Sequence, residues 1–145
     1  MNFFVQKVNI PGLSLPEIDV GNPLIRVPYP GDHLLYEELE ITYRVDEDLR
    51  NYMELHSWLR SIGKRSFEEY RTIANNSKTS GEGIRSDISL SVLTSNRNAN
   101  YEVVFKDAFP TRVTGIDFNT TDTDVDYVEA SATFRYVTYD VGKVS

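Results

Sequence analysis

The sequence lacks several residue types on which common protein functions depend. Among its 145 residues there is no cysteine, and there are only two histidines and one tryptophan. The absence of cysteine excludes disulfide bonds and thiolate metal sites. Histidine is the side chain most often used as a general base, and we expect neither His33 nor His56 to be catalytic. No other nucleophile motif is present, so the sequence predicts no enzyme and no cofactor.

Long hydrophobic runs and an excess of basic residues are also missing. No stretch approaches the roughly 18 apolar residues of a membrane-spanning helix, so we expect no membrane span. The opening residues, MNFFVQKVNIPG, lack a basic segment followed by a long apolar run, and we expect no signal peptide. The net charge of −7 argues against a surface that grips nucleic acid, because such surfaces are basic.

Three aspartates in the last third of the chain have the spacing of a calcium-binding loop. They are Asp122, Asp124 and Asp126, which place Tyr127 at the sixth position of such a loop and Thr133 at the twelfth. A calcium loop needs glycine and glutamate at those positions. The pattern therefore favours a solvated turn, and no metal site is predicted.

The residues that are abundant point to β structure. Aromatic residues make up 12% of the chain, with nine Tyr and seven Phe, and aromatic side chains are enriched in strands. Hydrophobic residues make up 40% and charged residues 26%, as in an ordinary globular protein. A chain of this length has enough residues for one hydrophobic core, so we expect a single domain over residues 1–145.

Two long alternating segments, 38–45 and 127–136, carry the strongest signal. Each has apolar residues at every second position, which predicts a strand with one buried and one wet face. The wet faces carry the same order of Glu first and Arg last. Their residues are Glu38, Glu40, Thr42 and Arg44 in the first segment and Glu129, Ser131, Thr133 and Arg135 in the second. They could be two solvent faces of a β-sandwich, or two adjacent strands that line a polar, mildly acidic pore.

One helix is predicted between these segments. Asp46 is a suitable N-cap, and Gly63 stands where a helix would end. Leu55, Trp58 and further apolar residues recur at helical spacing and form one stripe. We expect Trp58 to be buried between the helix and the sheet. A second, shorter helix is predicted over 66–74, followed by an exposed loop over 75–83.

The remaining segments read as strands and turns. A hairpin is expected over 24–39, with its tip at the Pro-rich run 28–32. Near the C-terminus we expect a strand from Tyr101, a break at Phe109–Pro110, a second short strand, an acidic turn and a final strand that reaches Val141. Further strands are expected over 3–10, 13–21 and 86–94.

The order of these segments resembles the tail tube proteins of contractile-tailed, T-even-type bacteriophages, including related tube-initiator and baseplate ring proteins. The resemblance is carried by Gly31–Asp32, by Trp58 on its helix, and by Phe109–Pro110–Thr111 followed by a final strand rich in aromatic residues. The opening FVQKVNI resembles the first strand of that family. The region from Lys64 to Gly83 has no clear counterpart there.

The resemblance implies a fold and an assembly. The fold would be mainly β with one prominent helix, a β-sandwich-like unit whose inner strands join a continuous barrel in a hexameric ring. The wet faces of the two alternating strands would then face the lumen. Rings would stack through the long hairpin, with four residues as its apolar surface: Tyr29, Leu34, Leu35 and Tyr36.

The resemblance also implies partners and a location. Like or related rings, the tail sheath, and baseplate or terminator proteins would contact the tube, and DNA would pass through it without specific binding. The protein would be part of the virion tail and would assemble in the host cytoplasm. A repeating tube subunit, a tube-initiating or baseplate-proximal ring, a terminal ring, and a tube ring of a bacterial injection apparatus remain open.

A monomeric β-sandwich that binds carbohydrate or protein is the alternative from a different class. Such a module would need surface aromatic residues gathered on a groove. Tyr29, Tyr36, Tyr127 and Tyr139 are the candidates, although they are scattered along the chain.

Overall fold

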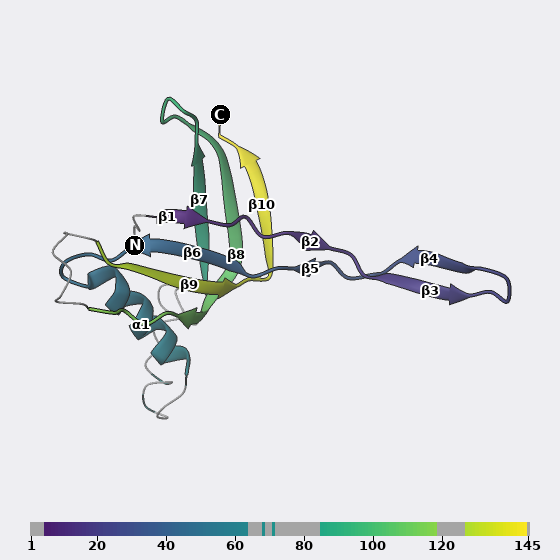
Figure 1. Cartoon of the computed structure of the whole chain (residues 1–145), viewed down its shortest axis with the longest axis horizontal. Coiled ribbons are helices and arrows are strands. Elements are labelled where there is room, and N and C mark those ends of the chain that lie inside the picture. Colours follow the sequence, from purple (N-terminus) through teal and green to yellow (C-terminus); the bar gives the residue numbers. More distant parts are fainter. Residues whose placement is uncertain (1–4, 64–67, 69–70, 72–84, 119–126, 145) are drawn as a thin grey trace.

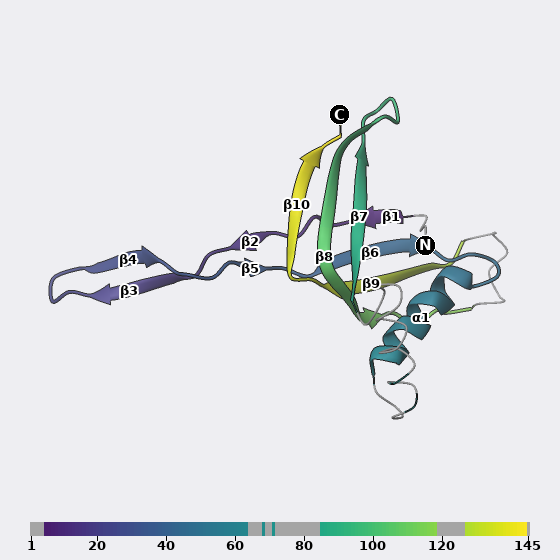
Figure 2. The same ribbon diagram turned by 180° about the vertical axis from the view of Figure 1, so that it is seen from behind.

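The computed structural model describes residues 5–63, 68, 71, 85–118 and 127–144. Strands make up 53% of these residues, which confirms the expected mainly β fold with one prominent helix. Figures 1 and 2 show the arrangement from opposite sides. The elements in chain order are β1 (Val5–Val8), β2 (Leu13–Ser14), β3 (Glu17–Gly21), β4 (Arg26–Pro30), β5 (Leu35–Tyr36), β6 (Leu39–Arg44), α1 (Arg50–Ile62), β7 (Ser86–Leu93), β8 (Ala99–Val113), β9 (Glu129–Arg135) and β10 (Thr138–Lys143).

One six-stranded antiparallel sheet forms the body of the molecule. Its strand order is β1-β6-β9-β8-β10, and β7 also pairs with β8. The sheet has two parts, and strand β8 connects them. Its first residues pair with β7 and β10, and its last residues pair with β9. We call β1, β6, β9 and residues 109–113 the base, and β7, β10 and residues 99–108 the blade. The two parts cross in Figure 1, so the sheet curls into a half-barrel.

The core lies on the concave side of this curled sheet. The alternation predicted for β6 and β9 is confirmed, because the apolar residues of both strands are buried and the polar ones face away. Helix α1 and the blade close the core from the other sides. The buried hydrophobic residues are Leu39, Ile41, Tyr43, Val45, Leu55, Val103, Phe105, Ala108, Ala130, Ala132 and Phe134.

Helix α1 begins later than the sequence predicted. Its N-cap is Leu49, which has a φ of 56°, and Asp46 instead accepts a turn hydrogen bond from the Leu49 amide at 2.9 Å. The buried Asn51 explains the difference. Its Oδ1 accepts from the Asp46 amide at 3.2 Å, and its Nδ2 donates to the Arg44 carbonyl at 2.8 Å. These bonds satisfy backbone groups between β6 and the helix, so the chain turns before it becomes helical.

The expected break at Phe109–Pro110 is wrong, because β8 runs through both residues. Proline is tolerated where no ladder hydrogen bond is needed from its nitrogen, and β7 pairs with β8 only as far as Ala108. The final strand is also not continuous. It divides into β9 and β10 at Tyr136–Val137, where the Val137 amide donates to the Lys106 carbonyl at 3.0 Å. This corner follows the bend of β8 from base to blade.

The predicted hairpin is present, but its tip is elsewhere. Residues 11–37 form an extended two-stranded arm, in which β2 pairs with β5 and β3 with β4. The turn lies at 22–25, and residues 28–30 of the Pro-rich run 28–32 that was expected to form it belong to β4. Pro28 and Pro30 lie opposite Asp19 and Glu17 in a two-stranded ribbon with open edges, where the missing N–H group of proline is tolerated. Figures 1 and 2 show the arm projecting away from the body.

A glycine sits at a tight point within the arm. The Gly31 amide donates to the Pro16 carbonyl at 2.7 Å, and a Cβ at Gly31 would lie 2.4 Å from that oxygen. Any side chain there would force the two strands of the arm apart.

Several sequence-based expectations fall on residues that the structure does not describe. The loop at 75–83 and the three aspartates Asp122, Asp124 and Asp126 lie outside the described residues. The short helix expected at 66–74 also lies outside them, except at Glu68 and Arg71. These expectations stay predictions.

Candidate functional site

The structure brings the two predicted wet faces together. Strands β6 and β9 are direct neighbours, with Glu40 opposite Thr133 and Thr42 opposite Ser131. The hydroxyl groups of Thr42 and Ser131 lie 3.1 Å apart in a hydrogen bond. Beyond the last paired residues of the two strands, Glu38 and Arg135 form an ion pair, with 3.3 Å between the carboxylate oxygen and the guanidinium nitrogen. The eight residues singled out in the sequence therefore form one continuous polar face, which we call the base polar face.

The neighbouring strands add two cations to this face that the sequence analysis missed. Lys7 on β1 lies opposite Thr42, and Arg112 on β8 lies opposite Thr133. Only strand register reveals them, since neither lies in a regular alternating segment. The eight predicted residues include two cations and three carboxylates. With Lys7 and Arg112 the face carries four cations and three carboxylates. The face is thus nearly balanced in charge rather than mildly acidic.

The arm carries more apolar surface than the sequence analysis assigned to it. Tyr29, Leu34 and Leu35 are exposed. The strand pairing places Ile18 beside Tyr29 and Val20 beside Val27 on one face of the ribbon. Its opposite face is formed by polar residues and prolines. The alternation of apolar residues with Glu17 and Asp19 was the available signal for this apolar face.

Tyr36 differs from the other predicted arm residues, because it is half-buried at the root of the arm. Its ring packs edge-on against Tyr136 and Tyr139, with ring centroids 5.8 Å apart in both pairs. Phe105 contacts the same two rings at 5.0 and 5.6 Å. These four residues form an aromatic cluster where the arm joins the body.

Hydroxyl groups of this aromatic cluster hold both strands of the arm. Tyr136 donates to the Glu37 carbonyl at 2.8 Å, and Tyr139 donates to the Pro11 carbonyl at 3.1 Å. Burial raises the pKa of Tyr136 to about 12, so its phenol remains a proton donor at physiological pH. The direction of the arm is therefore set by contacts with the body.

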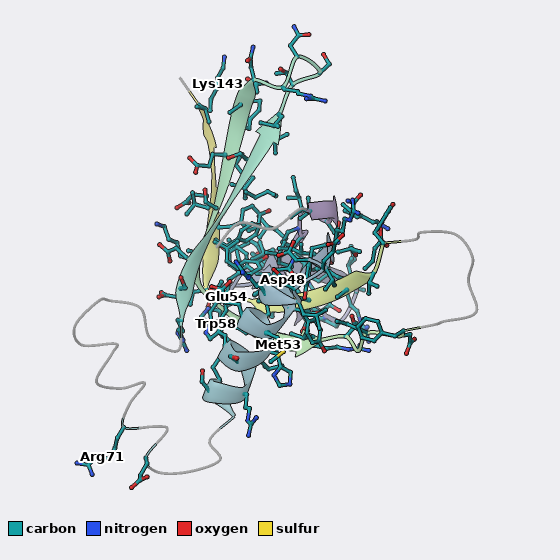
Figure 3. All side chains as sticks on the ribbon, turned by 90° about the vertical axis from the view of Figure 1, so that its left-hand side faces the viewer. Asp48, Met53, Glu54, Trp58, Arg71 and Lys143 are labelled. Atoms are coloured by element: carbon teal, nitrogen blue, oxygen red, sulfur yellow. The ribbon has the colours of Figure 1, made fainter. Side chains whose placement is uncertain are left out.

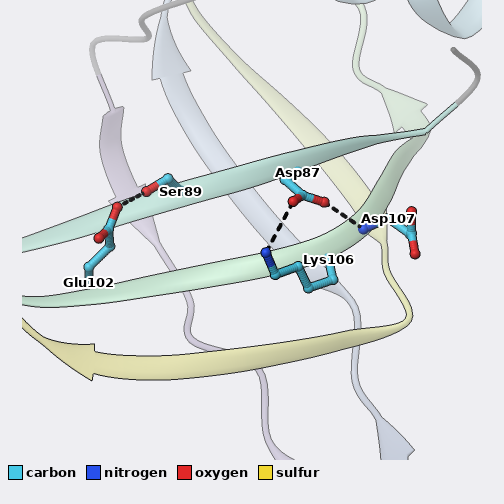
Figure 4. Close-up of polar contacts among 5 residues, drawn as sticks. All are labelled: Asp87, Ser89, Glu102, Lys106 and Asp107. Carbon is cyan, nitrogen blue, oxygen red and sulfur yellow. Dashed lines mark hydrogen bonds and ion pairs between the residues drawn. The ribbon is translucent and has the colours of Figure 1, made fainter. Parts of the chain in front are cut away.

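The outer face of the blade forms a second polar surface. Asp87 accepts hydrogen bonds from the Asp107 amide at 3.1 Å and from Lys106 at 3.2 Å, and Ser89 donates to Glu102 (Figure 4). The hydrogen bond from the Asp107 amide, together with Lys106, lowers the pKa of the Asp87 carboxyl. Asp107 has a φ of 53°, a conformation that is rare outside glycine. The Asp87 carboxylate therefore accepts the hydrogen bond of a backbone amide at the point where β8 bends.

The residues considered for other chemistry do not assemble into a site. His56 is exposed on α1 and stacks on Tyr52, with ring centroids 6.2 Å apart, and His33 is exposed on the arm. Within the described ranges, no group of three or more His, Asp or Glu side chains could hold a metal ion. No helix in the part of the chain that the structure describes is long and apolar enough to cross a membrane.

The tyrosines proposed for a binding groove are also dispersed. Tyr36 and Tyr139 pack together at the root of the arm, whereas Tyr29 lies on the arm itself. Tyr127 lies near β9, where Arg44 covers its ring at 4.7 Å. The four side chains therefore do not line one groove.

Comparison with solved structures shows the same fold in tubular contractile assemblies. The tube-terminating cap of the anti-feeding prophage aligns with a TM-score of 0.65 and 14% identity over 99% of this chain and 82% of that chain. The sheath/tube terminator of the extracellular contractile injection system PVC gives 0.60 and 16%, over 98% and 86%. The PVC sheath-tube complex gives 0.60 and 18%, over 99% and 82%.

The sequence itself matches one protein family. No curated protein matches significantly. A family profile described as "Phage tail tube protein" matches residues 1–142, nearly the whole chain. Together with the curled sheet and the long arm, this match shows that the chain belongs to the phage tail tube protein family.

Proposed function

We propose that this protein is the ring subunit of a phage tail tube, that six copies close into a ring, and that DNA passes through the channel at ejection. It would act as a structural protein of the virion tail, assembled in the host cytoplasm, with no enzymatic role. Its partners would be like or related rings, the tail sheath, and baseplate or terminator proteins. The similar structures come from a tube cap, a sheath/tube terminator and a sheath-tube complex, which supports this choice of partners.

The base polar face is the observation that carries the proposal. A continuous sheet face of Thr, Ser and balanced charges has little use as a binding site, but it suits a wall along which DNA slides. DNA is held when cations replace the counterions of its phosphates. Here Arg135 is paired with Glu38, and the carboxylates nearly match the cations in number. Such a wall offers DNA little net attraction.

The open strand edges of the monomer support a ring. Among the described strands, β1, β7 and β10 each pair on one side only, so each presents unpaired backbone groups. Exposed edges invite further strand pairing, and a closed barrel shared by several subunits removes them. A head-to-tail contact that closes by rotation gives a ring instead of an open fibre.

Electron microscopy of purified protein tests the assembly. Rings or tubes with sixfold averages and a central channel are expected. Featureless particles of monomer size at high protein concentration would contradict the ring. A tube-initiating, baseplate-proximal or terminal ring is the remaining alternative, and it predicts rings that form single short stacks instead of long tubes.

Charge reversal on the base polar face tests the channel. Replacing Glu40 and Glu129 with Lys raises the charge of that face by four per subunit. We expect assembled rings to retain DNA at low salt and to release it as the salt concentration rises. Subunit stability should change little, because exposed charges contribute little to it. Retention is measured by co-sedimentation of DNA with the rings.

A matched variant on the other polar surface provides the control. Glu102→Lys with Asp140→Lys makes the same change of four charges on the outer face of the blade. If the base lines the channel, only the first variant should retain DNA that nuclease cannot reach. Protection by the blade variant alone would place the base polar face outside the channel.

A further inference from the structure

The arm is built from two separately paired segments. The root segment, residues 11–14 and 35–37, contains β2 and β5, and the distal segment, residues 17–30, contains β3 and β4. Between the two segments, residues 15–16 of one strand lie opposite residues 31–34 of the other. Two residues opposite four interrupt the ladder as a bulge does, and such interruptions bend a ribbon. The two strands of the arm cross at this point in Figures 1 and 2.

The root segment is held by side chains of the body. The hydroxyl groups of Tyr136 and Tyr139 donate to carbonyl groups of the two strands of the arm, one on each strand. The hydroxyl group of Tyr36 lies 3.1 Å from that of Thr138 on β10, in a third hydrogen bond. Pro11, where the arm begins, is fully buried. These contacts come from both strands, so the root segment cannot turn without breaking them.

Two further hydrogen bonds join the strands of the root segment to each other. The Glu37 amide donates to the Gly12 carbonyl at 3.2 Å, and the Gly12 amide donates to the Glu37 carboxylate at 3.1 Å. The same Glu37 residue accepts the hydrogen bond of Tyr136 at its carbonyl. Pairing within the root segment and its attachment to the body therefore involve the same residue and support each other.

The distal segment has no comparable support. Among the described strands, β3 and β4 pair only with each other, and every residue of both strands is exposed. A two-stranded ribbon without a packed face is marginal in water. Within the described residues, one backbone hydrogen bond spans the interruption between the two segments, from the Gly31 amide to the Pro16 carbonyl at 2.7 Å. A single hydrogen bond resists bending only weakly.

We propose that the arm is hinged: the aromatic cluster fixes the root segment on the free subunit, and the distal segment swings about residues 15–16 and 31–34. Fixing the root segment in advance lowers the conformational entropy that a later contact must remove. The hinge lets the distal segment adapt to the surface that it meets, as hinges of a few loop residues do in other proteins. Both properties belong to the single subunit, so the proposal does not depend on the proposed ring.

Distances between spin labels test the hinge directly. The chain has no cysteine, so two introduced cysteines are the only labelling sites. Ser91→Cys on the blade is the reference, combined with Ser14→Cys on the root segment or with Asn22→Cys at the tip of the arm. All three positions are exposed. In dilute solution, where sedimentation shows single subunits, we expect a narrow distance distribution for the root segment and a broad one for the tip.

Removing the anchoring hydroxyl groups should release the root segment. Tyr136→Phe with Tyr139→Phe keeps both aromatic rings, and the distribution for the root segment should broaden to match that of the tip. Exchange of the Glu37 amide with solvent should rise roughly 25-fold, about fivefold for each hydrogen bond lost. Tyr29→Phe with Tyr101→Phe, at two exposed positions, is the matched control and should change neither measurement.

The Val45 amide shows whether the fold survives these changes, because it donates within the body to the Val128 carbonyl at 2.8 Å. Its exchange should stay the same in the double variant. If it rises, the single variants Tyr136→Phe and Tyr139→Phe replace the double one, and each should raise exchange of the Glu37 amide about fivefold.

Gly31→Ala tests the position of the hinge separately. An added Cβ would lie 2.4 Å from the Pro16 carbonyl oxygen, so the two strands must separate at the interruption. The distance from the blade to the tip should shift and its distribution should broaden, while the distance to the root segment stays the same. A shift of both distances would place the joint elsewhere.

Three other results would overturn the proposal. Narrow distributions for both positions in the unaltered protein would show a rigid arm, and broad distributions for both would show that the root segment is not anchored. An unchanged root segment in the tyrosine variants would show that the hydroxyl groups do not hold it. Because all of these measurements are made on single subunits, their outcome is separate from whether the protein forms rings.

Discussion

Tyr136 and Tyr139 show how single residues connect the core to the arm. Their rings pack on Phe105, which is fully buried. Their hydroxyl groups donate to carbonyls of the two strands of the arm, at the root where these strands join the body. The aromatic rings stabilise the core by packing, and the hydroxyl groups make directional hydrogen bonds to the arm, which phenylalanine could not make. These tyrosines stand at the corner between β9 and β10, so the arm is oriented by the same residues that turn the sheet.

Asp87 yields a prediction about pH. Its pKa is lower in the folded protein than in the unfolded chain, so its ionised form stabilises the fold above a pH of about 4, the ordinary value for aspartate. This contribution is lost as the pH falls through the lowered pKa. Asp87→Asn should therefore be less stable than the unaltered protein near neutral pH, and the two should converge in acid. Urea unfolding from pH 7 to pH 3 measures the difference.

Asp140→Asn is the control for this experiment, because Asp140 is an exposed carboxylate on the same blade face. It should follow the unaltered protein over the whole pH range. A gap between Asp87→Asn and the unaltered protein that stays constant down to pH 3 would show that the lost charge is not the cause.

At the scale of elements, helix α1 contributes less burial than its sequence predicted. Trp58 is half-buried, with its ring 6.2 Å from that of Phe134, and only Leu55 and Asn51 on the helix are fully buried. Trp58 and Met53 point to different sides of the helix in Figure 3. The helix covers one end of the curled sheet, so part of its apolar stripe remains at the surface.

This geometry lowers the expected effect of removing the tryptophan. Trp58→Ala should destabilise the fold by about half of the roughly 3–5 kcal/mol that a fully buried Trp would lose. Met53→Ala, at an exposed position of the same helix, should be nearly neutral. Chemical denaturation followed by circular dichroism compares the two. Equal stability of both variants would show that Trp58 belongs to a subunit contact instead of the core.

For the whole molecule, assembly explains surfaces that a monomer would not expose. Leu34 and Leu35 are exposed where the arm approaches the body. Replacing both with Asp should leave the fold and the ring intact, because neither side chain is in the core, but it should prevent rings from stacking. Thermal unfolding checks the fold, and electron microscopy measures the length of the assemblies. Tubes as long as those of the unaltered protein would exclude these two residues from the stacking surface.

The sequence by itself determined the local features of this protein. The alternation in 38–45 and 127–136 predicted which residues of β6 and β9 are buried, because the period of a strand is a property of neighbouring residues. The apolar stripe around Leu55 predicted helix α1 in the same way. The order of these segments also predicted the tail tube family, which the match over residues 1–142 confirms.

Only the tertiary structure decided which segments meet. It paired β6 with β9, added Lys7 and Arg112 to the base polar face, and anchored the arm through Tyr136 and Tyr139. It also places the tip of the arm at residues 22–25, outside the Pro-rich run. The last predicted strand is two strands, β9 and β10, which meet at a corner. Register and strand order depend on how distant segments bury their apolar faces together, and no local pattern in the chain records that choice.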